Sequence, residues 1–311
     1  MSLQSCGSAC EQDEAFFIER KVSGMRTRFR KSGRSVVVTG AGKGLGREIA
    51  LGLAARRYIV FGTANSMREA DDLRTASKGR VSLAVCNLKN AATVSAWAAG
   101  VSEAVGASGL DILINITTHL SPAPLELVSP EEIRQGFEVN VFGGLAVINA
   151  FLPALRIAHG RIVQISSWAS ESPRYFDGMS VASQAAMDAF ATAYRAELRP
   201  FGIDVIVASM SDLEAAGAQA TTALAQIDHS MTPEQRRLYG ARLRVCMEKL
   251  AALGAQGAPT SVAARVVELS IQRHVPPKAS IDEDAEQLMR CIREQTDAEL
   301  NSLRTRLAGP P

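Results

Sequence analysis

The sequence lacks any uninterrupted apolar run close to the ~18 residues that a membrane-spanning helix needs. It also lacks a strong charge imbalance, and a formal net charge of +2 gives no reason to expect nucleic acid as a partner. The five cysteines are odd in number and scattered, without metal-ligand spacing, which favours a reduced compartment and no metal centre. Acidic residues interrupt any signal-peptide core near the N-terminus. We therefore expect a soluble, cytoplasmic globular protein.

The most informative stretch that is present reads VVVTGAGKGLG, residues 36–46. Three β-branched valines predict a short strand that is buried on both faces. Glycines then break the run, and a helical apolar stripe begins at once with Leu45, Ile49 and Leu53. A strand, a glycine-rich turn and a helix N-terminus together form an anion site, because unpaired backbone N–H groups and the helix dipole both point at the turn. The stretch predicts a site for a pyrophosphate.

The spacing of the glycines follows TGxxxGxG rather than GxGxxG, and it resembles the short-chain dehydrogenase/reductase family. The resemblance implies an α/β fold with a doubly wound parallel sheet of the Rossmann type, here with extra C-terminal helices. It also implies oxidoreductase activity on a small-molecule substrate and a nicotinamide cofactor. The residues expected to contact this cofactor are Gly40, Lys43, Gly44, Leu45, Gly46, Asn65, Asn87 and Asn115.

The form of the cofactor is predicted from the end of the second strand. Dinucleotide folds usually place an acid about 20 residues past the glycine turn, where it holds the ribose 2′-hydroxyl. Residues 63–66 read Thr-Ala-Asn-Ser, without Asp or Glu, and Arg68 follows just beyond. Lys43, within the turn, is placed to meet a 2′-phosphate. The sequence therefore predicts NADP(H) in preference to NAD(H).

The catalytic pattern of the family is present only in part. By resemblance, Ser167 positions the substrate oxygen, and Asn140 sustains a water-linked proton path. Ser180 stands where the family has its catalytic Tyr, and Gln184 stands where it has Lys. A neutral Gln cannot lower the pKa of a neighbouring acid as Lys does, and a Ser hydroxyl is a far weaker acid than a phenol. Because a positioned general acid is worth about 10²–10⁴ in rate, standard alcohol–ketone interconversion should be badly impaired.

Three functions stay open on these residues. In the first, the chain is a reductase with a non-standard site, which acts on an imine, an iminium or an activated double bond of a small, secondary-metabolite-like substrate. His119, Tyr175 and Asp177 are then the candidate replacement acids. Alternatively, it catalyses a cyclisation, isomerisation or elimination without net redox change, or it is a non-catalytic partner subunit of an active paralogue. We favour the reductase, because retained dinucleotide binding best explains the intact turn.

The organisation of the chain follows from composition and pattern. Residues 1–32 are predicted to be a poorly ordered N-terminal extension, 33–211 the dinucleotide-binding core, and 212–311 a substrate lid with a helical C-terminal extension. Helices at about 130–158 and 181–199 are where the family pairs its subunits, so we expect a homo-oligomer, dimer or tetramer, or a hetero-oligomer with a paralogue. The strands are predicted at 36–38, 58–62, 81–85, 110–114, 161–165 and 203–207.

Overall fold

The structure, a computed structural model, describes residues 33–116, 122–167, 176–210, 217–254, 260–282 and 286. The chain falls into two compact units, each of which is described by itself. The first unit comprises Met1–Ile116, Phe142–Val163 and Tyr194–Val205, and the second comprises Thr117–Val141, Gln164–Ala193 and Ile206–Pro311. The predicted N-terminal extension, residues 1–32, lies outside the described residues.

Seven strands form one sheet in the order β3-β2-β1-β4-β5-β6-β7. The pairings described in detail, β1 with β2, β1 with β4, β2 with β3 and β6 with β7, are all parallel. The predicted doubly wound parallel sheet is confirmed. The strands are β1 Ser35–Val38, β2 Ile59–Ala64, β3 Val81–Val85, β4 Ile112–Asn115, β5 Arg161–Ser167, β6 Asp204–Met210 and β7 Lys278–Ser280.

The strand order reverses beside β1. The chain runs from β1 outward through β2 to β3 and then returns to β4, on the other side of β1. In open α/β sheets, ligands bind outside the carboxyl ends of the strands at such a switch point. The glycine turn that follows β1 lies at this position.

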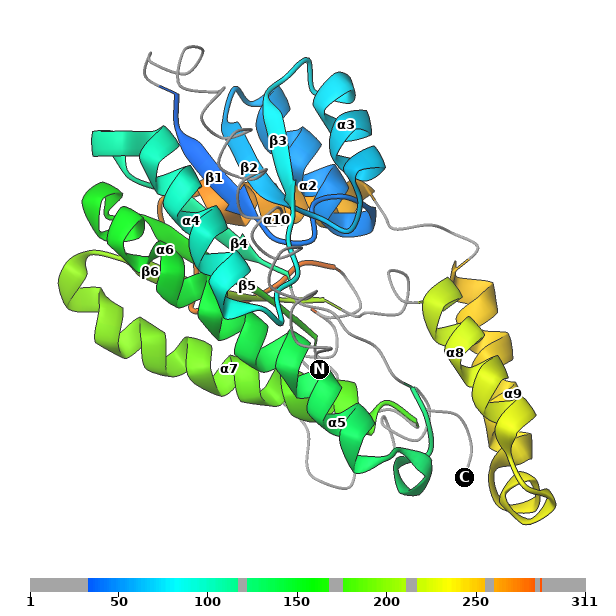
Figure 1. The fold of residues 1–311 in the computed structure, drawn as a ribbon. Helices are drawn as coiled ribbons and strands as arrows, with labels where there is room; N and C mark the ends of the chain where they lie inside the picture. The colour runs from blue at the N-terminus through cyan, green and yellow to red at the C-terminus, as the bar shows by residue number, and fades with distance from the viewer. Residues whose placement is uncertain are drawn as a thin grey trace, which may run out of the picture. The chain divides into compact units, whose positions relative to one another are not determined.

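Helices connect the strands and cover the sheet. Their bounds are α2 Gly44–Ala55, α3 Met67–Ala76, α4 Ala91–Val105, α5 Pro130–Phe137, α6 Gly144–Ala158, α7 Gly178–Leu198, α8 Gly217–Ser230, α9 Pro233–Gly254 and α10 Thr260–Ile271. In the first unit, α2 packs with α3 on one face of β1 to β4, and α4 packs with α6 on the other (Figure 1). Right-handed crossovers produce this two-sided covering when the strand order reverses.

The core of the first unit is apolar on both sides of the sheet. Val36, Val37 and Val38 of β1 are fully buried, as their continuous β-branched run predicted. On the face covered by α4 and α6, the Trp97 and Phe151 rings meet edge to face, with centroids 5.0 Å apart. This ring contact joins α4 to α6 on that face of the sheet.

The helix predicted from 130 to about 158 is present but is not uniform. Ser129 caps it through a complete capping box with Glu132. Between α5 and α6, residues Glu138–Gly143 form a π-helical turn, which the sequence analysis did not anticipate. Such turns insert an extra residue into a helix and are frequent at functional sites.

The same span is the one helix among the described residues that is long and apolar enough to cross a membrane by length and composition. Pro130–Ala158 has 29 residues and a mean hydropathy of 1.7 over its most apolar window. Buried core helices can meet the same criteria of length and composition. In this helix Val147, Ile148 and Phe151 are buried at 1% exposure or less, and Phe151 contacts Trp97 of α4. The helix is therefore a packed element of the fold.

The second unit contains features that sequence patterns described less well. The stretch 212–230, predicted as a lid, includes the helix α8, which lies antiparallel beside α9 (Figure 1). Leu224, Met231 and Leu243 form the buried centre of this hairpin. The strand β7 was missed altogether, because its three residues, Lys-Ala-Ser, carry no apolar run.

Candidate functional site

The glycine turn is fastened to the two strands that flank β1. Thr39 Oγ1 donates to the Ile116 carbonyl at 2.9 Å and accepts from the Ile116 N–H at 2.6 Å. The Gly40 N–H donates to Thr63 Oγ1 at 2.8 Å. Hydroxyls at the ends of the strands thus replace the sheet ladder where β1 stops, and they hold the turn in one conformation.

The backbone geometry of the turn explains why glycine stands at positions 40, 44 and 46. Gly40 and Gly44 have φ of +63° and +53°, where a side chain would strain the backbone. A Cβ on Gly46 would overlap the Gly40 carbonyl, whose carbon would lie 2.8 Å away. The absence of that Cβ lets α2 press against the turn, which is the close helix–strand packing that dinucleotide folds require.

The N-terminus of α2 has no side-chain cap among the described residues. Its N-cap residue, Lys43, makes no capping hydrogen bond, and the first turn contains no acid. By contrast, Ser66, Asn90 and Ser129 cap α3, α4 and α5. The uncapped N–H groups of α2 are therefore available to an anion, and the residues present fit the pyrophosphate of a dinucleotide.

The other predicted cofactor residues lie in the same unit with different exposure. Asn115 is fully buried, and its Oδ1 lies 3.4 Å from Thr39 Oγ1. Leu45 is packed into the core. Asn65 and Asn87 are exposed. The Asn87 Oδ1 accepts from the Lys89 N–H at 3.1 Å, which shapes the loop after β3.

One residue beside the turn was missed by the sequence analysis. Glu69, in the first turn of α3, accepts the Asn65 N–H on Oε2 at 2.8 Å, and a Cβ on Gly42 would overlap its carboxylate. Glu69 lies three residues beyond the Thr-Ala-Asn-Ser stretch, residues 63–66, which contains no acid. The signal was the spacing Ser66-x-x-Glu69, typical of a helix start, which turns an acid back toward the preceding strand end.

The family positions in the second unit are joined by a chain of hydrogen bonds. Asn140, in the π-helical turn, donates from Nδ2 to Ser183 Oγ at 3.0 Å. Ser183 Oγ donates in turn to the Ser180 carbonyl at 2.9 Å. The structure thus brings Asn140 and the start of α7 together through Ser183, a residue that was not among the predicted site residues.

The side chains at the altered catalytic positions are buried. Ser167, at the end of β5, is 2% exposed, Ser180 is 5% exposed and Gln184 is 8% exposed. Ser180 and Gln184 are one helical turn apart and share a face of α7. Ser180 Oγ finds no hydrogen-bond partner among the described residues. A buried hydroxyl without a partner costs stability, so its retention is a candidate sign of function.

The candidate replacement acids are described only in part. Asp177 directly precedes α7 and is buried, and its carbonyl accepts the Val181 N–H at 2.9 Å. His119 and Tyr175 lie outside the described residues. In the part of the chain that the structure describes, no three His, Cys, Asp or Glu side chains gather as they would around a metal ion.

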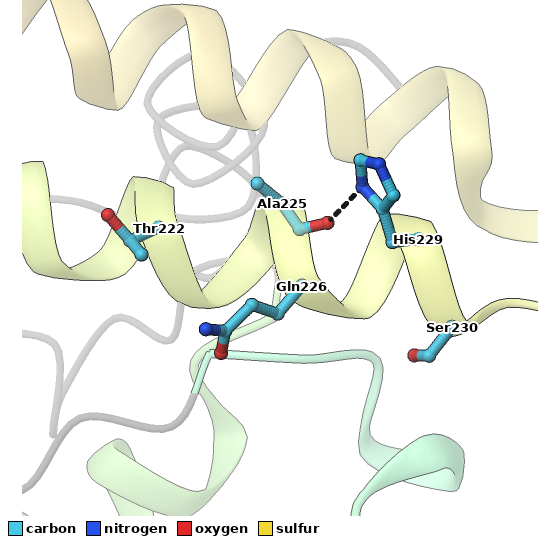
Figure 2. Close-up of a pocket in the computed structure, with 5 residues that line it drawn as sticks. All are labelled: Thr222, Ala225, Gln226, His229 and Ser230. Carbon is cyan, nitrogen blue, oxygen red and sulfur yellow. Dashed lines mark hydrogen bonds between the residues drawn. The ribbon is translucent and has the colours of Figure 1, made fainter.

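A hollow of about 540 Å³ lies along α8, and no predicted site residue is among the residues that line it. Thr222, Ala225, Gln226, His229 and Ser230 line it, and all five come from one face of the helix (Figure 2). The His229 Nδ1 lies 3.1 Å from the Ala225 carbonyl, so one imidazole nitrogen is engaged within the helix.

Comparisons with known proteins agree with this geometry. The sequence model of the family described as short chain dehydrogenase matches residues 34–224. An NADPH-dependent 3-dehydrocapnine reductase of Ornithobacterium rhinotracheale is 28% identical over 56% of this chain, and short-chain dehydrogenase PC-15 of Penicillium crustosum is 33% identical over the same share. In both cases the match spans 63% of the relative's length.

The fold is also found among solved structures. A short-chain dehydrogenase from Streptomyces avermitilis superposes with a TM-score of 0.70 at 23% identity, covering 90% of this chain and 99% of the other. A strand–glycine turn–helix at the switch point of a doubly wound sheet defines a class of dinucleotide-binding proteins. Within that class, the chain belongs to the short-chain dehydrogenase family.

Proposed function

We propose that this protein is an oxidoreductase that binds a nicotinamide dinucleotide at the turn between β1 and α2 and acts on a small molecule. The observation that carries the proposal is the combination of an uncapped α2 with a turn in which Gly40 and Gly44 have positive φ and Gly46 leaves no space for a side chain. A glycine loop kept only for flexibility would not need the three constraints together.

The residues that would hold the cofactor are those of the turn and of the strand ends around it. The α2 N–H groups would bind the pyrophosphate, and Asn115 and Thr63 would fix the strand ends on either side. The bound cofactor supplies the hydride. The chain itself supplies buried hydroxyls on Ser167 and Ser180, which can hold a polar group of the substrate.

The substrate is proposed to be one whose reduction needs no strong acid. The two positions that Ser180 and Gln184 occupy provide neither a phenol to protonate an alkoxide nor a neighbouring cation to lower the pKa of such an acid. An iminium carbon accepts hydride and becomes a neutral amine without any proton. Hydride addition to an activated double bond gives an enolate-type anion, which then takes its one proton from water. We infer that the substrate belongs to one of these classes.

A preference for NADP(H) is also proposed, on the basis of Lys43. Its side chain is exposed at the N-terminus of α2, where a 2′-phosphate would gain a cation. A relative is named for dependence on NADPH. Lys43→Gln should weaken NADPH binding and leave NADH binding unchanged, whereas Lys89→Gln, at an exposed lysine beyond β3, should affect neither.

Two glycine variants test the site. Gly44 and Gly106 have φ of +53° and +55°, and a Cβ on either would meet nothing within 4 Å. Alanine should therefore strain the backbone at both positions, because L residues rarely adopt a φ in this range. Only Gly44→Ala places a methyl group where the cofactor would approach, so it should raise the dissociation constants of NADH and NADPH at least about tenfold, while Gly106→Ala leaves them within twofold.

Titration followed by nicotinamide fluorescence measures these constants. Equal effects of the two alanines would show that the turn does not bind the cofactor. Absence of any binding to the wild-type chain at millimolar cofactor would overturn the proposal as a whole.

A second candidate, a subunit that acts mainly by assembly, is supported by one face of α7. Ala182, Ala185, Ala189 and Phe190 are exposed along it, and Phe190 is 43% exposed. Small residues beside an exposed ring permit the close approach of another helix. We propose that α7 pairs with a second copy or with a paralogue. The cytoplasmic location stays a prediction.

A further inference from the structure

The Glu69 carboxylate is held over the glycine turn by its own loop. The Asn65 N–H donates to Glu69 Oε2 at 2.8 Å, and the Glu69 N–H donates to Ser66 Oγ at 3.3 Å. Both the side chain and the backbone of Glu69 are therefore held by the residues that precede α3. Gly42 leaves the space that the carboxylate occupies: a Cβ there would lie 3.0 Å from the carboxyl carbon and 3.1 Å from Ala64 Cβ. The carboxylate therefore stands between the turn and the end of β2.

The charge of Glu69 is not balanced by a nearby cation. Among the described residues no ion pair includes it. Arg68, its neighbour, has a side chain that is 92% exposed and lies 4.0 Å from Asp72, farther along α3. Arg47, on α2, is paired with Glu48 at 3.1 Å. Lys43 is thus the exposed cation of the turn itself, and Glu69 carries the opposing charge beside it.

We propose that Glu69 is the residue that determines how far this site discriminates between NAD(H) and NADP(H). The carboxylate accepts the ribose 2′-hydroxyl of NAD(H) and repels the 2′-phosphate of NADP(H), whereas Lys43 attracts that phosphate. Dinucleotide folds place an acid for the 2′-hydroxyl past the end of the second strand, and Glu69 reaches this place from α3 rather than from the strand end. Because the two charges act in opposite directions, the site accepts both NAD(H) and NADP(H). Its preference for NADP(H) is smaller than Lys43 alone would give. This inference rests on the proposed function.

The test is Glu69→Gln, which removes the charge and keeps an acceptor of the same size. Gln also suits this position at a helix start, so the hydrogen bond from Asn65 can persist. The dissociation constant of NADPH should fall about tenfold, which corresponds to about 1.4 kcal/mol, because a repulsion between two charges has been removed. That of NADH should stay the same or rise by up to about threefold, since a neutral acceptor binds a hydroxyl less strongly.

Asp72→Asn is the matched control, because it removes the same charge from the same helix at a residue that does not touch the turn. It should leave the ratio of the two dissociation constants within twofold of the wild-type ratio. An unchanged ratio in Glu69→Gln, or an equal shift in Asp72→Asn, overturns this inference and leaves the proposed function standing. If the wild-type chain binds neither cofactor, the proposed function fails, and the inference fails with it.

Discussion

Replacing Ser183 with Ala removes the hydroxyl that joins the π-helical turn to α7. Ser183 is fully buried, accepts from Asn140 Nδ2 at 3.0 Å and donates to the Ser180 carbonyl at 2.9 Å. A hydrogen bond contributes about 0.5–1.5 kcal/mol net, so losing both should cost about 1–3 kcal/mol. For a chain of this size, about 2 °C is lost per kcal/mol, and the melting temperature should fall by about 2–6 °C.

Thr192→Val is the matched control for this experiment. Thr192 lies on the same helix, and its hydroxyl donates to the Asp188 carbonyl at 2.9 Å, but the residue is exposed to solvent. Water replaces that bond, so the melting temperature should change by less than about 1 °C. Scanning calorimetry of both variants decides the matter. Equal small shifts would show that the buried bridge contributes no net stability and that Asn140 is held by other contacts.

Two further predictions concern chemistry and assembly. The wild-type chain should reduce simple ketones and aldehydes weakly. The double variant Ser180→Tyr with Gln184→Lys should raise that turnover by up to about 10²–10⁴-fold, measured by NADPH absorbance. Fast turnover by the wild-type chain would contradict the reasoning. Ala189→Glu on α7 should dissociate any oligomer, because an unpaired charge at a helix interface costs several kcal/mol. Ala99→Glu, at an exposed residue of α4, should not change the mass measured by light scattering, and equal masses for the two variants would exclude α7 as the interface.

The parts of the fold that were predicted correctly are those whose signals are local. The valines of β1 and the glycine turn each lie within a few consecutive residues, and the structure forms them where the sequence indicated. β7 was missed because a strand of three residues at the sheet edge gains its stability from pairing with β6. No apolar pattern is needed in such a strand, and none is present.

The candidate site was less accessible from the sequence, because it depends on where side chains turn. Glu69 lies beyond the window in which an acid was sought, and only the turn of α3 brings its carboxylate back over Gly42. Asn140 was identified by resemblance, but its hydrogen bond to Ser183 is made from a π-helical turn. A sequence pattern with the 3.6-residue period of an α-helix does not predict such a turn. The roles assigned to Ser167, Ser180 and the other catalytic positions stay predictions.

The π-helical turn at Glu138–Gly143 allows side chains in one helical segment to point in two different directions, each of which the fold requires. Downstream, α6 must keep the phase that buries Val147 and Phe151. Within the turn itself, Asn140 faces Ser183, to which its Nδ2 donates at 3.0 Å. The extra residue of a π turn absorbs the mismatch between these two directions, which a regular α-helix of the same span could not do. Deleting one residue from this segment would rotate everything that precedes it relative to α6, so a deletion there should destabilise the protein more than most single substitutions.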